Sequence, residues 1–193
     1  MNETTSRRLP KAERREQLLD TALAIVREHG TDALTLGHLA ERAGVSKPIA
    51  YEHFKTRAGL LMALYQQLDQ RHAAALREAL ANTRPRLADV ARVASAAYID
   101  CYDELGAEWL AVSAALRGDE AMEAFQQQVL DNDIALYSQA FAPYTKRTAE
   151  ELRLMCTALL GAAEAITREL SHGRIRRPAA TEALAGLIVR ALR

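Results

Sequence analysis

Apolar residues recur at every third or fourth position through most of this chain, which is the spacing of helices that bury one face. In the first such segment, residues 11–29, the positions predicted to face a core are Leu18, Leu19, Ala22, Leu23, Ile25 and Val26. Glycine and proline separate further helices, which we place at 57–82, 85–105, 107–117, 119–141, 145–172 and 178–192. With two short helices between Thr35 and Arg57, the pattern predicts an all-α protein of about nine helices.

The segment from Thr35 to Arg57 reads TLGHLAERAGVSKPIAYEHFKTR and predicts two short helices joined by a tight turn. Four apolar residues of the first helix share one face, because they lie three or four positions apart: Leu36, Leu39, Ala40 and Ala43. Thr35 can cap this helix through its hydroxyl, and Gly44 follows where helices commonly end in a left-handed residue. We therefore expect the chain to turn at Gly44.

The second helix of this segment follows Ser46, which offers a cap, and has Pro48 in its first turn, where a missing amide hydrogen costs nothing. Ala50 and Phe54 lie four positions apart and can pack back on the first helix. The remaining side chains point outward: Lys47, Pro48, Ile49, Tyr51, Glu52, His53, Lys55 and Arg57. Since a DNA major groove roughly 12 Å wide admits one α-helix, the segment predicts a DNA-binding helix-turn-helix, with an ordinary helical hairpin as the alternative.

The stretch from about Arg14 to Leu64 resembles the N-terminal DNA-binding domain of the TetR family of transcriptional regulators. The resemblance rests on RREQLLDTALAIVREHG at its start and AGVSKPIAYEHFKTRAGL towards its end. It implies that the following residues occupy positions that commonly meet phosphate or base: Thr35, Lys47, Pro48, Tyr51, His53, Lys55 and Arg57. We add Ile49 to this set, although a small hydroxyl residue is frequent there in the family, because isoleucine can contact a thymine methyl group.

Glu52 also departs from the family pattern, since it is an acid on the side of the helix that faces DNA. Its carboxylate either accepts a hydrogen bond from a cytosine amino group or points away from the phosphates, and we favour the second interpretation.

The helices at 145–172 and 178–192 are the candidates for a dimer interface. Their apolar positions are Leu152, Met155, Leu159, Ala163, Ile166 and Leu170 on the first helix, and Leu184, Leu187 and Ile188 on the second. These faces either bury themselves inside one subunit or form a four-helix bundle about a two-fold axis. The family resemblance implies the homodimer, in which two recognition helices about 34 Å apart read the halves of a palindrome.

The middle helices hold the candidates for a ligand pocket. Most aromatic residues of the chain and one cysteine gather there: Tyr98, Cys101, Tyr102, Trp109, Phe125, Tyr137 and Phe141. They suit a mostly apolar pocket in which tyrosine hydroxyls orient a small molecule, although an aromatic stripe at helical spacing also forms ordinary core. The acids Asp100, Glu104 and Asp133 would favour a cationic ligand if they were buried.

Charge changes this picture little, because 25 basic and 25 acidic residues cancel over the 193 residues. Residues 1–57 carry 10 Lys and Arg against 8 Asp and Glu, a small excess for a DNA-binding unit. Non-specific affinity grows with the number of phosphates neutralised, so such a unit depends on shape and on binding as a pair.

Enzymatic chemistry has no support in the sequence. We expect no catalytic residues, cofactor or metal, because there is no phosphate-binding glycine loop, HExxH or nucleophile elbow, and the five histidines show no ligand spacing. Two cysteines, no signal peptide and no long apolar run favour a cytoplasmic protein without a membrane span.

Taken together, the predictions describe a homodimeric regulator with a DNA-binding domain at 1–56 and a helical ligand-binding and dimerisation domain at 57–193. We expect a repressor that a small molecule releases from a palindromic operator. Two alternatives stay open: a regulator of the same fold that its ligand drives onto DNA or that activates transcription, and a helical ligand-binding or enzymatic protein that does not bind DNA.

Overall fold

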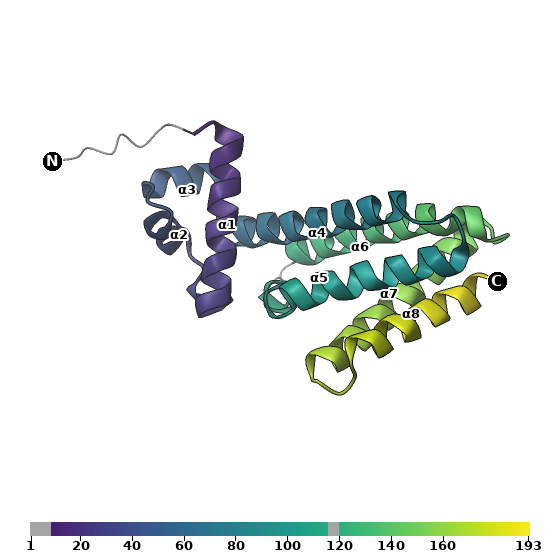
Figure 1. Ribbon diagram of the computed structural model, residues 1–193. Helices are drawn as coiled ribbons and strands as arrows, with labels where there is room; N and C mark the ends of the chain where they lie inside the picture. Colours follow the sequence, from purple (N-terminus) through teal and green to yellow (C-terminus); the bar gives the residue numbers. More distant parts are fainter. Residues whose placement is uncertain (1–8, 116–119) are drawn as a thin grey trace.

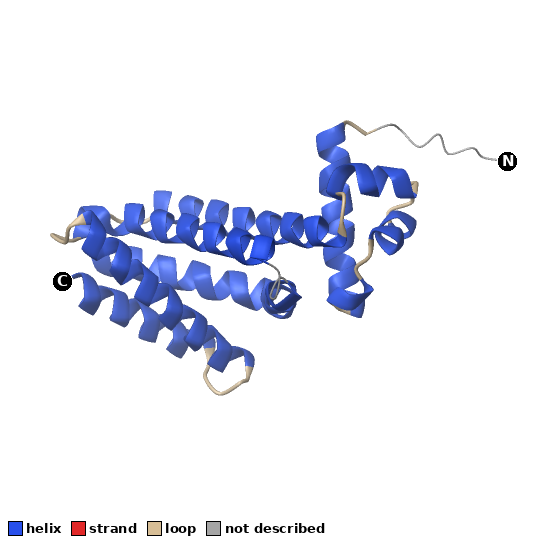
Figure 2. Cartoon of the chain, turned by 180° about the vertical axis from the view of Figure 1, so that it is seen from behind, coloured by secondary structure: helices blue, strands red, loops and turns tan. Residues whose placement is uncertain are grey.

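The structure, a computed structural model, describes residues 9–115 and 120–193, including their side chains except those of 102–107, 109, 110 and 120. Helices and loops but no strand occur in this part of the chain, so the predicted all-α class is confirmed (Figure 1, Figure 2). The α-helices are α1 (Lys11–His29), α2 (Leu36–Arg42), α3 (Lys47–Phe54), α4 (Arg57–Ala81), α5 (Leu87–Ala115), α6 (Glu120–Phe141), α7 (Ala149–Ser171) and α8 (Arg177–Leu192). Two short 3-10 helices are η1 (Thr31–Ala33) and η2 (Ala142–Tyr144).

The helices form two parts that share α4 (Figure 1). In the N-terminal part, Leu18 of α1 and Leu39 of α2 are buried together with Leu60 and Leu64 from the first half of α4. In the larger part, α4 packs against α5 and α6, and α7 and α8 pack against α5. Leu76, in the second half of α4, belongs to this second core. A displacement of α4 therefore acts on both parts.

Local interactions set the ends of the two short helices. The Thr35 hydroxyl accepts a hydrogen bond from the His38 backbone N–H at 3.1 Å, which confirms the predicted cap of α2. Gly44 follows α2 with a φ of 65°, in the left-handed region that glycine adopts readily. The predicted cap by the Ser46 side chain is wrong. The amide that it would bind, that of Ile49, donates instead to the Ser46 carbonyl at 3.0 Å.

The helix break predicted at Gly106 does not occur, because α5 is continuous from Leu87 to Ala115. A glycine in a helix interior costs only about 1 kcal/mol relative to alanine. Packing outweighs this cost, since α5 lies against both α4 and α8 and buries Val90, Ala94 and Ile99. None of the described helices is long and apolar enough to cross a lipid bilayer.

The apolar faces of α7 and α8 are buried within their own subunit. Five residues assigned to a dimer interface are buried in the second core: Leu152, Leu159, Ala163, Leu184 and Ile188. Four more are half-buried: Met155, Ile166, Leu170 and Leu187. The structure thus corrects the assignment of the buried five. Their helical spacing identified an apolar face on each helix, but only the fold shows that the neighbours are α5 and α7 for α8, and α8, α6 and α5 for α7.

Candidate functional site

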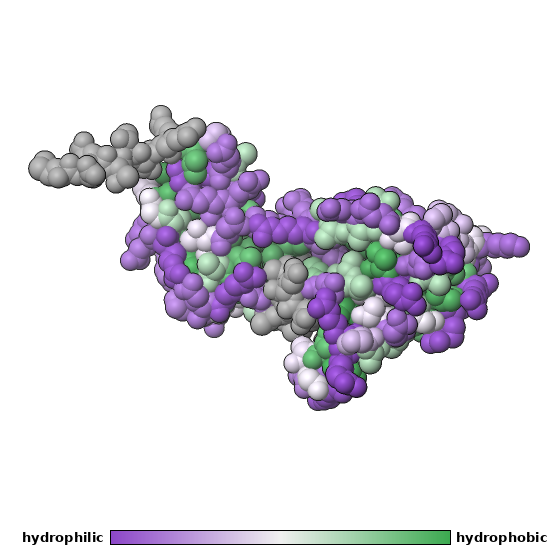
Figure 3. Space-filling view, in the orientation of Figure 1, coloured by the Kyte–Doolittle hydropathy of each residue, from purple (hydrophilic) through white to green (hydrophobic). Residues whose placement is uncertain are grey.

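α3 lies at the end of the molecule farthest from the C-terminus, beside α1 and α2 (Figure 1). Ala50 and Phe54 are buried against the N-terminal core, as predicted. The opposite side of α3 is open to solvent, with Lys47 and Pro48 exposed and Tyr51 51% exposed. The surface over this end of the chain is mainly hydrophilic (Figure 3). A short helix with an accessible N-terminal half is therefore available to a groove.

The chain leaves α3 through a tight turn at Lys55. This residue has φ 64° and ψ −56°, and it is the one non-glycine residue with positive φ in the described part of the chain. The Thr56 N–H donates to the Phe54 carbonyl at 2.7 Å, which closes a three-residue γ-turn around Lys55. Backbone in such a region stores about 1–3 kcal/mol of strain and often marks functional sites. The side chain of Lys55 is exposed.

The same turn brings the end of α3 into close contact with the beginning of α4. A Cβ atom at Gly59 would lie only 2.3 Å from the Phe54 carbonyl oxygen, so glycine is required at this close approach. The Thr56 hydroxyl caps α4 by accepting from the Gly59 N–H at 3.0 Å. No flexible linker therefore separates the two helices, and the orientation of α3 follows that of α4.

The side chain of Arg57 forms hydrogen bonds with backbone carbonyls of its own chain. Its guanidinium donates to the Leu34 carbonyl at 3.0 Å through Nε and to the Thr31 carbonyl at 2.7 Å through Nη2. These carbonyls belong to the connection between α1 and α2, so Arg57 fastens the first turn of α4 to that connection. Sequence spacing placed Arg57 beside the DNA-facing residues, but it could not reveal these two acceptors.

α1 holds α3 from the other side. Nη1 of Arg15 donates to the His53 carbonyl at 3.0 Å, and the Arg15 guanidinium lies 5.0 Å from the centre of the Phe54 ring. Nζ of Lys11 donates to Glu52 at 3.1 Å, and this hydrogen bond lowers the pKa of the Glu52 carboxyl. Glu52 therefore faces α1, in agreement with the interpretation that it points away from phosphate.

Two residues predicted to contact DNA are partly enclosed. Ile49 is half-buried and packs against the N-terminal core. His53 is also half-buried, and desolvation lowers its pKa below the usual 6.5, which favours the neutral imidazole. A neutral imidazole can hydrogen-bond a phosphate but does not neutralise its charge.

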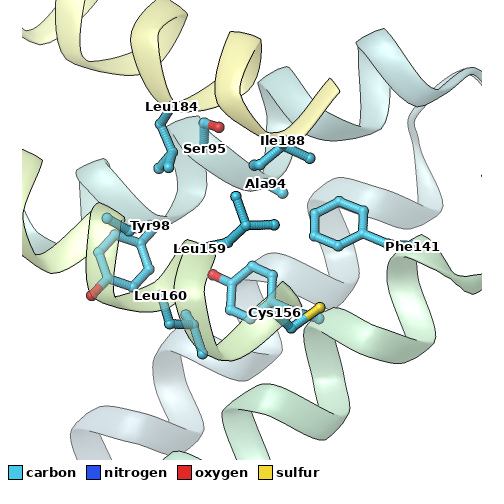
Figure 4. A pocket seen from close by; sticks show the side chains of 11 residues that line it. Ala94, Ser95, Tyr98, Phe141, Cys156, Leu159, Leu160, Leu184 and Ile188 are labelled. Carbon is cyan, nitrogen blue, oxygen red and sulfur yellow. The ribbon is translucent and has the colours of Figure 1, made fainter. Parts of the chain in front are cut away.

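Tyr98, Tyr137 and Phe141 come together around a small cavity between α5, α6, α7 and α8. Figure 4 shows apolar side chains such as Leu159 and Ile188 around the same space. The cavity has a volume of about 20 Å³, which holds roughly one water molecule. Ligand pockets of small molecules usually measure about 300–1,000 Å³, so this space is closed to such a molecule.

His72 adds a polar group to this region that the sequence did not single out. Its Nε2 lies 3.2 Å from the Tyr137 hydroxyl, and its ring meets that of Tyr98 edge to face. Nδ1 of His72 and Oγ of Ser95 are buried and have no hydrogen-bond partner among the described residues. Burial lowers the pKa of His72 to about 4, so the ring is neutral at pH 7. His72 continues an apolar stripe at four-residue spacing after Leu68, and a histidine there was the available signal.

The other predicted pocket residues lie elsewhere. Cys101 lines a groove between α4 and α5. Phe125 packs against the N-terminal core, with its ring edge to face with Tyr65 at 6.0 Å. The side chains of Tyr102 and Trp109 lie outside the described residues.

Comparison with known proteins agrees with this geometry. Residues 18–64, which contain α2 and α3, match the family described as "Bacterial regulatory proteins, tetR family". The activator FasR of Mycolicibacterium smegmatis is 40% identical over 76 residues, which cover 39% of this chain and 35% of that protein. The regulator BetI of Rhizobium meliloti is 36% identical over 112 residues, which cover 55% and 54%. The chain thus spans between a third and about half of the length of these curated relatives.

The likeness in structure extends over the whole chain. A TetR-like transcriptional regulator from Rhodococcus sp. RHA1 superposes with a TM-score of 0.70 at 25% identity, over 96% of this chain and 98% of that one. The matched helix-turn-helix, the relatives and the shared fold lead to one conclusion: residues 18–64 form a DNA-binding domain of the tetR family, in a chain with the fold of a TetR-like transcriptional regulator.

Proposed function

We propose that this protein is a homodimeric repressor that binds a palindromic DNA operator and leaves it when a small molecule binds. The observation that carries this proposal is the accessible N-terminal half of α3, held in place by α1 and α4. In the proposed complex α3 enters the major groove, and the DNA-facing residues are Thr35, Lys47, Pro48, Tyr51 and Lys55, all exposed.

Ile49, His53 and Arg57 have a different role in this proposal. Their contacts with the core, with Arg15 and with the α1–α2 connection position α3 rather than neutralise phosphate. That leaves Lys47 and Lys55 as the lysines nearest the groove on each copy. A single copy therefore binds few phosphates, which supports a pair of subunits on two half-sites.

The proposed dimer uses the outward faces of α7 and α8. Leu154 of α7 is 73% exposed, and a Cβ atom added at Gly161 would meet nothing within 4 Å. Small exposed residues continue both faces: Ala158 and Ala165 on α7, and Ala179 and Ala183 on α8. Small residues allow close approach, so two copies can form a four-helix bundle about a two-fold axis.

The proposed ligand site is the space among α5–α8, where Tyr98, Tyr137 and His72 supply polar groups to an apolar surround. The space of about 20 Å³ has to open several-fold before a small molecule fits. His72 lies on α4 beside this space. Opening the space therefore displaces α4, the helix that carries α3. A ligand that binds the opened state more tightly weakens operator binding, and the operator weakens ligand binding by the same factor.

The division into a DNA-binding unit at 1–56 and a ligand-binding and dimerisation unit at 57–193 remains our proposal, with α4 packed in both cores. We place the protein in the cytoplasm with its DNA, acting as a regulator without a catalytic step, in keeping with its family of regulatory proteins.

The test begins with purified protein and sheared DNA from the source genome. Fragments that remain bound at physiological salt should share a two-fold symmetric sequence, and a reporter behind that sequence should be repressed by the protein. Recovery of fragments without a common sequence would contradict sequence-specific regulation.

Activation is the second candidate, because one relative is named a transcriptional activator. The same reporter separates the two functions, since an activator raises expression when the protein is present.

A further inference from the structure

A second space lies between α4 and α6, separate from the cavity among α5–α8. This groove has a volume of about 440 Å³, which falls in the range of small-molecule sites. Carboxamides from both helices line it, with Gln66 and Gln70 on α4 and Gln128 on α6. Apolar surface is also present, including that of Val129 and Leu136.

Two carboxyl groups meet in this groove, Asp69 from α4 and Asp133 from α6. Asp69 is only 9% exposed, and no N–H or hydroxyl donor of the described residues reaches its buried Oδ1. The two carboxyls are close enough to influence each other, and like charges so placed disfavour ionisation of both. Burial, with the charge of Asp69 beside it, raises the pKa of Asp133 to about 7.

We propose that this groove binds an organic cation with a primary ammonium group, whose N–H donors bind the carboxylates of Asp69 and Asp133 and satisfy the buried Oδ1 of Asp69. The ammonium supplies donors to both carboxylates and offsets their repulsion, while its carbon chain lies along the apolar lining. A metal ion fits less well, because no group of three His, Cys, Asp or Glu within residues 9–115 and 120–193 could hold one.

The surrounding charges limit the ligand to a single ammonium group. Arg77 of α4 also lines the groove, and two turns of helix, about 12 Å, separate its position from that of Asp69. A second cationic group near Arg77 would be repelled. Hexylamine therefore suits the groove as a probe, and 1-hexanol is its uncharged counterpart.

Binding should be linked to pH, because the cation replaces a proton. Below the raised pKa of Asp133 a proton has to leave before hexylamine binds, so affinity should rise between pH 6 and 8, by at most about tenfold per unit. The other groups around the pair are Arg77 and His72 on α4, Tyr137 on α6, and Tyr98 and Cys101 of α5 beside Tyr137. On α7, Arg153 is held by Asp131.

The pH dependence should come from the pair and not from these neighbours. His72 has a pKa of about 4 and is neutral throughout this range. Burial raises the pKa of Tyr137 far above it, so this phenol also stays neutral.

Isothermal titration calorimetry on the full chain, without DNA, tests the proposal independently of the proposed repressor function. Hexylamine should bind, 1-hexanol should not, and heats in two buffers of different ionisation enthalpy should reveal proton release. Asp69→Asn and Asp133→Asn should each weaken hexylamine binding by about tenfold or more. Asp131→Asn is the matched control on the same helix and should bind as the parent does, because Asp131 pairs with Arg153.

Equal binding of the amine and the alcohol would overturn the proposal, as would binding that survives both Asp69→Asn and Asp133→Asn. So would binding of calcium chloride in place of hexylamine. Because the amine and alcohol are compared on the unaltered chain, the proposal stays open to refutation if a variant fails to fold.

Discussion

At the scale of single residues, the tightest constraint lies where α3 passes into α4. Three residues determine this junction: Phe54 turns its carbonyl towards Gly59, and Lys55 takes a positive φ to allow it. Such a junction transmits a rotation of α4 to α3, because it has no flexible linker to absorb the movement.

Replacing Gly59 by alanine should destabilise the fold. The new Cβ would approach a backbone oxygen to 2.3 Å, so the junction has to shift, at a cost of about 1–3 kcal/mol in the free energy of unfolding. Urea denaturation of Gly59→Ala measures this loss. Gly37→Ala is the matched control in α2, because its Cβ would make only ordinary contacts, the nearest at 3.8 Å. Equal stability of the two variants would refute the close contact.

The buried imidazole of His72 should make the free energy of unfolding depend on pH. Its folded pKa of about 4 lies below the ordinary 6.5, so protons bind more readily to the unfolded chain between these values. Stability should therefore fall as the pH is lowered from 6.5 towards 4. Between pH 7 and 5 the parent should lose about 2 kcal/mol more than His72→Gln in urea unfolding.

Comparing the parent with His72→Gln cancels the opposite contribution of Asp133, whose folded pKa is raised. Parallel pH profiles of parent and variant would show that His72 is not held neutral by burial.

At the scale of elements, α3 is a short helix whose orientation depends on its neighbours. Arg15 of α1 binds its last turn, and Arg57 of α4 fastens the connection that precedes α2. Eight residues cannot maintain a helix on their own in water, so these contacts and the burial of Ala50 and Phe54 hold α3 in shape.

Arg15→Ala should impair operator binding without removing a DNA contact. The variant loses a charge-assisted hydrogen bond and a cation–π contact, together worth about 1–3 kcal/mol. We expect weaker binding to the operator in a fluorescence titration, with affinity for unrelated DNA nearly unchanged, because α3 is misplaced while its lysines remain.

Lys11→Ala is the control for the loss of a cation from α1, since its contact with Glu52 is exposed. An equal loss for operator and unrelated DNA in Arg15→Ala would mean that Arg15 contacts phosphate.

The helices also show which parts of the fold the sequence could predict. Spacing of apolar residues predicted α1–α4 and the buried side of α3, because α1, α2 and α3 each turn one face to the N-terminal core and α4 buries a continuous stripe in both cores. Spacing also predicted α7 and α8 as helices, but it left open whether their apolar faces are covered within the subunit, as Leu159 and Leu184 are, because periodicity does not reveal which neighbour covers a face. The roles of Arg15 and Arg57 could not be predicted either, because their acceptors are backbone carbonyls distant in sequence.

At the scale of the whole molecule, the two cores share α4, and the helices α7 and α8 lie away from α3 (Figure 1). In the proposed dimer, this arrangement leaves α3 free for DNA while two copies meet through their C-terminal helices. Pairing then compensates for the few cations that one copy brings to the phosphates.

Leu154→Glu should convert the protein into a monomer. A carboxylate at a 73% exposed leucine leaves the subunit intact but would be buried without a partner in the proposed interface. Leu130→Glu is the matched control, an exposed leucine on α6 outside that interface, and it should remain a dimer. Sedimentation velocity distinguishes the species. A dimeric Leu154→Glu would mean that the subunits meet elsewhere.

The central claim is that the exposed side of α3 reads DNA, and titration of a labelled operator at several salt concentrations tests it most directly. Lys47→Ala should weaken binding and lower the salt dependence, because one phosphate contact per subunit is lost. Tyr51→Ala should weaken binding with the salt dependence unchanged, and Lys146→Ala, an exposed lysine beyond α6, should bind as the parent does. If Lys47→Ala and Tyr51→Ala both bind the operator as tightly as the parent, α3 is not the recognition helix.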